Sequence, residues 1–174
     1  MKLHKKVITL GFSVLLYAGC TTDMSDSYLN PNDYGQTIEF LSDNFEMEYV
    51  PPKSYVPDYL DGYDIEYFSN YIAMAFNNSE QITALRFDSL SAEEVKVVLD
   101  GINMDIDEAL QLLLDDVDDF YEEHWQTHLT YDFDDYGVHI LGTENAIVEA
   151  KNIRGPYNLK IFYNKNIFED FLKK

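Results

Sequence analysis

Apolar residues spaced three and four positions apart, the spacing of one helix face, occur in three parts of the chain. They predict helices over residues 36–46, 65–77 and 105–120. Ser91 followed by Glu94 forms a capping-box pattern, which predicts a short helix that ends near Gly101. A last helix is predicted from Asn166 through Leu172.

Apolar and polar residues alternate in other segments, as in strands that bury one face. The alternation predicts strands over residues 81–87, 128–133, 138–141, 146–150 and 157–163, and turn-type residues separate those of the C-terminal half. The pattern therefore predicts an α+β fold. We expect a single small domain, with several helices packed on an antiparallel β-meander in the C-terminal half.

The first twenty residues differ from the rest in composition. A basic start, with Lys2, His4, Lys5 and Lys6, precedes a twelve-residue apolar run over 7–18. This run is too short for a bilayer core, which needs about 20 apolar residues, so it predicts an export signal. Residues 16–20, Leu-Tyr-Ala-Gly-Cys, resemble the lipobox of bacterial lipoproteins, in which small residues precede an acylated cysteine.

The resemblance implies that Cys20 carries lipid and that the leader, residues 1–19, is cut away. Residues 20–35 then form an acylated, flexible tether, and residues 36–174 form an acidic globular domain. The protein is expected in the bacterial cell envelope, attached to the membrane through lipid on Cys20. Thr21 stands where an aspartate tends to retain lipoproteins in the inner membrane, so the periplasmic side of the outer membrane is favoured in a Gram-negative host. An uncleaved or non-lipidated secretory leader and a retained anchor helix are the alternatives.

The charge balance narrows the choice of partners. Twelve Lys and Arg residues face 32 Asp and Glu residues, and removal of the leader takes away three of the lysines, so the processed chain has a formal charge of −23. Such a surface repels nucleic acid and favours a basic protein partner. The basic residues concentrate from residue 151 onward, which leaves two interpretations. The basic tail packs beside the acidic helices, or the acidic surface stays open for a ligand.

The sequence gives no indication of catalysis. The processed chain has no nucleophile-elbow, P-loop or dinucleotide-binding pattern, and its one cysteine is assigned to the anchor. We therefore expect a protein that is not an enzyme, with no catalytic residue and no cofactor.

A metal site is the weaker possibility. His124 and His128 are four residues apart, so a helix through both would point two imidazoles at one ion. Trp125 stands where a metalloprotease has its catalytic glutamate, which excludes that mechanism. The acidic turn over residues 132–135 offers a second, looser site for a divalent cation.

Acidic residues crowd the far end of the helix predicted over 105–120. They are Asp115, Asp116, Asp118, Asp119, Glu122 and Glu123. Carboxylates at a helix C-terminus oppose the helix dipole, so a bound basic group would offset their cost. Tyr59 and Tyr63 lie beside other acidic residues, and tyrosine offers a rigid contact surface. The sequence thus predicts a partner-binding face made of these acids and tyrosines.

These features lead to one hypothesis and two alternatives. The hypothesis is a lipid-anchored envelope protein that binds a basic partner, as an immunity or inhibitor lipoprotein would bind a toxin or hydrolase. The first alternative is an envelope module for a divalent cation or a cationic ligand. The second is a structural accessory lipoprotein of an envelope complex.

Overall fold

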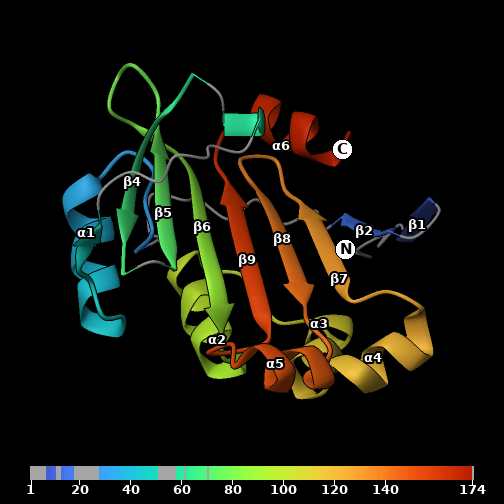
Figure 1. Ribbon diagram of the computed structural model, residues 1–174. Coiled ribbons are helices and arrows are strands. Elements are labelled where there is room, and N and C mark those ends of the chain that lie inside the picture. The colour runs from blue at the N-terminus through green and yellow to red at the C-terminus, as the bar shows by residue number, and fades with distance from the viewer. Residues whose placement is uncertain are drawn as a thin grey trace.

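The computed structural model describes residues 7–10, 13–17, 28–50, 58–60, 62–69 and 71–173. These residues form one α+β domain, as the sequence pattern predicts, with a single large sheet and helices packed against it (Figure 1). The lipid-bearing Cys20 of the sequence prediction and the first half of the predicted tether lie outside the described residues. The second half is not a tether: Leu29 is buried in the main core, its N–H donates to the carbonyl of Gly101 at 2.9 Å, and Tyr34 begins the first helix. Among the helices that the structure describes, none is both long and apolar enough to cross a membrane.

The strands of the described residues hydrogen-bond in the order β1-β2-β7-β8-β9-β6-β5-β4-β3. Their bounds are β1 Val7–Leu10, β2 Ser13–Tyr17, β3 Tyr49–Val50, β4 Asp64–Phe68, β5 Ile72–Phe76, β6 Ile82–Leu90, β7 His128–Asp132, β8 Gly137–Gly142 and β9 Tyr157–Phe162. Neighbouring strands from β7 to β3 are antiparallel. β1 and β2 form an antiparallel hairpin, and β2 pairs in parallel with β7. The described part of the predicted leader therefore lies at one edge of the sheet.

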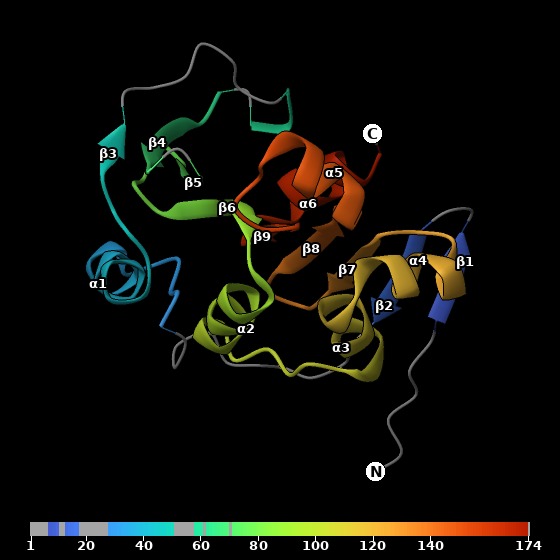
Figure 2. The same cartoon turned by 60° about the horizontal axis from the view of Figure 1, so that its bottom comes forward.

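The helices divide between the two faces of the sheet (Figure 2). On one face lie α1 (Tyr34–Asn44), α2 (Ala92–Gly101), α3 (Glu108–Asp115) and α4 (Val117–His124). On the other side lie α5 (Asn145–Lys151), α6 (Lys165–Leu172) and the short 3-10 helix η2 (Asp58–Leu60), which packs beside α6. The face under α1 to α4 therefore carries more of the described helices than the face under α5, α6 and η2.

The main core lies between the sheet and the helices α1 to α4. Leu85 and Phe87 of β6 and Leu159 and Ile161 of β9 point to this face and are buried, as is Phe120 of α4. Because side chains alternate along a strand, the residues between them point to the opposite face. There a smaller buried cluster packs under α6 and η2: Leu60, Ala75, Ala84, Phe162, Ile167 and Phe168.

Several elements confirm the sequence predictions. The helix predicted over 36–46 is α1, and the carboxylate of Asp33 caps it by accepting the N–H of Gln36 at 2.9 Å. The predicted capping box is present at α2, where Ser91 and Glu94 each accept the backbone N–H of the other. The strands β6 and β9 and the helix α6 also lie where the pattern predicts them.

The helix predicted over residues 65–77 is wrong. This segment forms β4 and β5, which pair with each other across a turn where Ser69 has a φ of 49°. β5, Ile-Ala-Met-Ala-Phe, is apolar at every position, and β4 contributes Ile65 and Phe68 before the turn. The apolar residues on either side of the turn therefore fall three and four apart by coincidence.

The strand predicted over residues 146–150 is also wrong, since this segment forms α5. β8 pairs directly with β9, so the sheet has no position for a strand between them. The helix α5 buries none of its residues, and Asn152 ends it in the left-handed conformation. It serves as a surface crossing between two neighbouring strands.

Candidate partner-binding surface

The helix predicted over residues 105–120 is two helices, α3 and α4, which meet at Asp116. The backbone of Asp116 is extended, with φ −156° and ψ 118°, so α3 ends there. Its carboxylate accepts the N–H of Asp118 at 2.8 Å and that of Asp119 at 3.3 Å. Asp116 therefore caps the start of α4, in the way that aspartate commonly does at this position.

This break corrects the electrostatic argument from the sequence. Asp118 and Asp119 lie in the first turn of α4, where the partial positive charge of the helix end stabilises carboxylates. Asp118 also accepts the N–H of Asn145 at 3.3 Å. The expectation that these two carboxylates oppose a helix dipole is therefore wrong. Only Glu122 and Glu123 lie near the C-terminal end of α4.

The outer side of α4 carries aromatic as well as acidic side chains. Val117 and Phe120 face the core, so residues on the opposite side of the helix face the solvent. They are Asp118, Asp119, Tyr121, Glu122, Glu123 and Trp125, which together we name the α4 surface. The side chain of Trp125 is 73% exposed and that of Tyr121 is 40% exposed, and their rings lie 6.2 Å apart in an edge-to-face arrangement.

Trp125 occupies a backbone position that does not suit it. It is the C-cap of α4 in the left-handed conformation, with φ 57° and ψ 28°, and its N–H donates to the carbonyl of Tyr121 at 2.7 Å. Glycine is the usual residue at such helix ends, because a side chain strains this conformation. The indole is also left largely in water. Neither the backbone nor the core of the domain explains a tryptophan here.

The basic tail does not neutralise the α4 surface. Arg154 pairs with Glu94, Lys165 with Asp132, and Lys173 with Asp170. Within the described ranges, the carboxylates of the α4 surface form no ion pair with a lysine or arginine. The tail thus packs beside acidic residues elsewhere, with Arg154 at α2 and Lys165 at β7, whereas the carboxylates on α4 have no such partner among the described residues.

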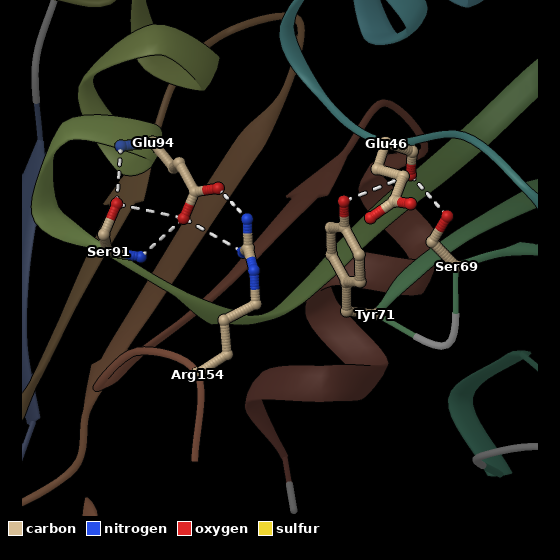
Figure 3. A network of polar contacts seen from close by, with 6 residues as sticks. All are labelled: Glu46, Ser69, Tyr71, Ser91, Glu94 and Arg154. Carbon is tan, nitrogen blue, oxygen red and sulfur yellow. Dashed lines mark hydrogen bonds and ion pairs between the residues drawn. The ribbon is translucent and has the colours of Figure 1, made fainter.

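Arg154 instead belongs to a network that holds four segments together (Figure 3). Its guanidinium binds both carboxylate oxygens of Glu94 and lies 4.6 Å from the ring centroid of Tyr71, whose hydroxyl donates to the carbonyl of Glu46 at 3.1 Å. Burial acts to raise the pKa of Glu94, but hydrogen bonds from Ser91 and Arg154 outweigh it and lower that pKa. The network is a structural clamp between α2, the α5–β9 loop, the β4–β5 hairpin and the segment after α1.

The two tyrosines of the predicted face lie elsewhere. Tyr59 belongs to η2, where its ring lies 5.4 Å from that of Phe171 and 6.0 Å from that of Phe162. Tyr63 is half-buried against the same cluster. This cluster lies with α6 on the far side of the sheet from α4, so the structure does not bring these tyrosines to the acids (Figures 1 and 2).

The two histidines of the predicted metal site are also kept apart in the fold. The helix ends at His124, and His128 belongs to β7, so the expected pair on one helix face does not form. The His124 ring stacks on Phe120 with the centroids 4.3 Å apart, whereas His128 lies 5.6 Å from His139. In the part of the chain that the structure describes, no three potential metal-ligating side chains cluster.

The binding face predicted from the sequence did not include Tyr121 and Trp125, which lie on α4 beside its acidic residues. The sequence did contain a signal for this surface: its single tryptophan, Trp125, follows the acidic residues of this helix and His124. Comparison of the chain with protein-family models, with curated proteins and with solved structures finds no match. The structure thus defines an α+β domain whose helix α4 presents an acidic and aromatic surface.

Proposed function

We propose that this protein is a non-catalytic, lipid-anchored protein of the bacterial envelope that binds a basic protein partner through the α4 surface. The observation that carries the proposal is the exposed indole of Trp125 at the end of a helix whose outer side is acidic. Tryptophan and tyrosine are enriched among the residues that dominate binding energy at interfaces. The basic character of the partner follows from the carboxylates that surround these rings.

The α4 surface combines two interactions that suit lysine and arginine. A guanidinium over the indole of Trp125 gains a cation–π interaction of about 0.5–1 kcal/mol when exposed, and more when the interface excludes water. Glu122 and Glu123, in the last turn of α4 just before Trp125, supply carboxylates at the same end of the helix. Val117 and Phe120 fix α4 to the core, so the surface is presented by a rigid element.

The concrete form of this proposal is an inhibitor or immunity protein. Lipid on Cys20 would hold the domain at the membrane, with residues 20–27 as the tether, while the α4 surface covers the active or receptor-binding site of a basic toxin or hydrolase. Charge complementarity of this kind gives specificity against other proteins, because an acidic partner would be repelled. No catalytic group of this chain takes part.

A photocrosslinking experiment tests the proposal in cells that produce the full chain. A photoreactive amino acid replaces Tyr121, and the matched control places it at Tyr49, which is 61% exposed on β3 near the opposite edge of the sheet. We expect a basic protein to crosslink through position 121 and not through position 49. The adduct should disappear when Glu122→Gln and Trp125→Ala are added.

Three results would contradict the proposal. They are the absence of any adduct at position 121, the same adducts from positions 121 and 49, and an adduct with an acidic protein that survives the substitutions. A partner produced by the same cell at all times would support the structural accessory alternative in place of immunity. Sensitivity of a deletion strain to rival bacteria separates the two, because only loss of an immunity protein should raise it.

The cation-binding alternative has less support in the structure. Asp132 of the acidic turn already forms an ion pair with Lys165, whose ammonium also donates to the carbonyl of Phe133. Calorimetry with calcium and with zinc tests this alternative directly. A stoichiometric heat of binding with either ion would support it over protein binding.

A further inference from the structure

A hollow lies between the start of α1 and the open end of the β4–β5 hairpin, and we name it the α1–β4 hollow. Its volume is about 390 Å³. Sites for small molecules have volumes of roughly 300–1,000 Å³, so a small ligand has room here. Two aromatic rings, three carboxylates and one amide line the hollow: Tyr34, Phe76, Asp64, Glu66, Glu80 and Asn77.

The strand register explains why acids line this hollow. Asp64 of β4 pairs with Phe76 of β5, and Glu66 pairs with Met74, which is fully buried in the main core. Paired residues on neighbouring strands point to the same face, and so do residues two apart on one strand. The face that forms core at Met74 therefore becomes acidic where it reaches the hollow.

Tyr34 and Phe76 form the aromatic part of the wall. Tyr34 is the first residue of α1, and its ring centroid lies 5.8 Å from that of Phe76 in a tilted arrangement. The hydroxyl of Tyr34 donates to Oε2 of Glu66 at 3.1 Å, which holds the carboxylate in place and leaves Oε1 to accept from a ligand. Tyr34 is 44% exposed and Phe76 is half-buried, so both rings keep surface for a ligand.

The carboxylates of this hollow face no cation from the described part of the chain. Within the described ranges, no lysine or arginine forms an ion pair with Asp64, Glu66 or Glu80, and none lines the hollow. Acidic residues alone do not distinguish this place in a chain that has 32 of them, but the hollow and its two rings do. Carboxylates beside aromatic rings in a concave site favour a cation that also has apolar surface.

We propose that the α1–β4 hollow binds a small organic cation, a primary amine whose ammonium group lies at Glu66 and Asp64 and whose apolar part lies against Tyr34 and Phe76. A primary ammonium group has three N–H donors, and carboxylates accept from it strongly. A bare metal ion suits the hollow less, because no three metal-ligating side chains cluster among the described residues. The hollow lies on the β4 side of the sheet and α4 on the β7 side, so this proposal does not depend on the α4 surface (Figure 1).

Amide chemical shifts of the purified protein provide the test. The titrations are made at neutral pH in about 0.1 M NaCl, which screens general attraction to the acidic surface. Butylamine, a cation at this pH, is the probe. Butan-1-ol is its uncharged control, and tetramethylammonium is a cation that has no N–H donor. We expect saturable shifts at the backbone amides of Glu66, Phe76 and Asn77 with butylamine, weaker binding of tetramethylammonium, and no shifts with butan-1-ol.

Substitutions separate this site from general attraction between charges. Glu66→Gln keeps an acceptor for the Tyr34 hydroxyl but removes the charge, so it should weaken butylamine binding by about tenfold or more. Glu122→Gln removes the same charge from the exposed side of α4 and should leave the affinity unchanged. Phe76→Leu keeps an apolar side chain but removes the ring, so it should weaken binding about two- to fivefold.

Four results would overturn the proposal. They are equal affinity of the Glu66→Gln and Glu122→Gln proteins, equal shifts with butan-1-ol and butylamine, binding of tetramethylammonium at least as tight as that of butylamine, and an absence of saturable shifts at the hollow. The amide spectrum also shows whether each variant is folded. If Glu66→Gln disturbs the fold, Asp64→Asn removes a charge of the hollow at an exposed position, and its affinity is compared with the same Glu122→Gln control.

Discussion

Trp125→Gly should separate stability from binding more cleanly than any other change at the α4 surface. The left-handed backbone of Trp125 costs an L-residue roughly 1–2 kcal/mol, which glycine does not lose. Glycine in turn lowers the free energy of unfolding by about 0.5–1 kcal/mol, because it gives the unfolded chain more conformational freedom. The edge-to-face contact with Tyr121 is lost as well, and at an exposed site we assign it about 0.5 kcal/mol. These effects nearly cancel, so the free energy of unfolding should stay within about 1 kcal/mol of the original value.

Binding should respond very differently. An aromatic residue at the centre of an interface commonly contributes at least about 2 kcal/mol, which corresponds to a loss of about 30-fold in affinity. The assay measures urea unfolding of the purified protein, and titration calorimetry with the partner crosslinked through position 121. Tyr49→Ala is the control, since this exposed ring lies on β3, away from α4.

Two outcomes would refute this reasoning about Trp125. If Trp125→Gly destabilises the domain by several kcal/mol, the indole has a role in folding that its exposure does not reveal. If the affinity for the partner changes no more than in Tyr49→Ala, the α4 surface is not the interface.

Three further predictions concern the stability of the fold. Asp116→Ala removes the acceptor for two N–H groups at the start of α4, so it should cost about 1–2 kcal/mol in urea unfolding, whereas Asp115→Ala should cost less than about 0.5 kcal/mol. Burial lowers the pKa of Lys160 to about 8 in the folded protein, so the unfolded chain binds more protons between pH 8 and 10.5 and stability should rise with pH there. Lys160→Met should raise stability at pH 7 by about 1–3 kcal/mol and abolish that rise. Gly155→Ala should cost at least about 2 kcal/mol, because its Cβ would meet the backbone carbonyl of Leu90, which cannot move aside easily.

The controls for these changes are available in the same chain. Equal stability of Asp116→Ala and Asp115→Ala would show that another group caps α4. A Lys160→Met protein whose stability still rose between pH 8 and 10 would assign that rise to a different residue. Gly35→Ala lies in α1 with only the Asp33 carboxylate at 3.4 Å, so a loss there as large as at Gly155 would exclude the steric explanation.

Local signals in the sequence predicted much of the fold. The capping box of Ser91 and Glu94 works within four residues, and the alternation in β6 and β9 is long enough to identify a strand without knowledge of its neighbours. The hairpin of β4 and β5 was missed because its two strands follow each other directly in the sequence, with only a short turn between them. Two short strands rich in apolar residues, joined by a turn, then imitate a helical spacing.

The break between α3 and α4 was missed for a different reason. Leu113 of α3 and Val117 of α4 both pack above Gly142 of β8, so the apolar stripe continues across Asp116 without interruption. Asp116 is one of many acidic residues, and nothing in its local sequence marks it as a cap with certainty. Trp125 was missed as a surface residue because a large apolar side chain is expected in the core. Trp125 is exposed because α4 ends directly before it.

The cap at Asp116 also has a consequence for the speed of binding. Because α4 starts at this residue, the helix holds Asp118 and Asp119 in fixed positions at its positive end before any partner arrives. Such a surface attracts a basic protein from a distance and raises the association rate at low ionic strength, an effect that salt screens within about 10 Å at 0.1 M. Association of the domain with a basic partner should therefore slow as the ionic strength rises, even where the final contacts stay the same.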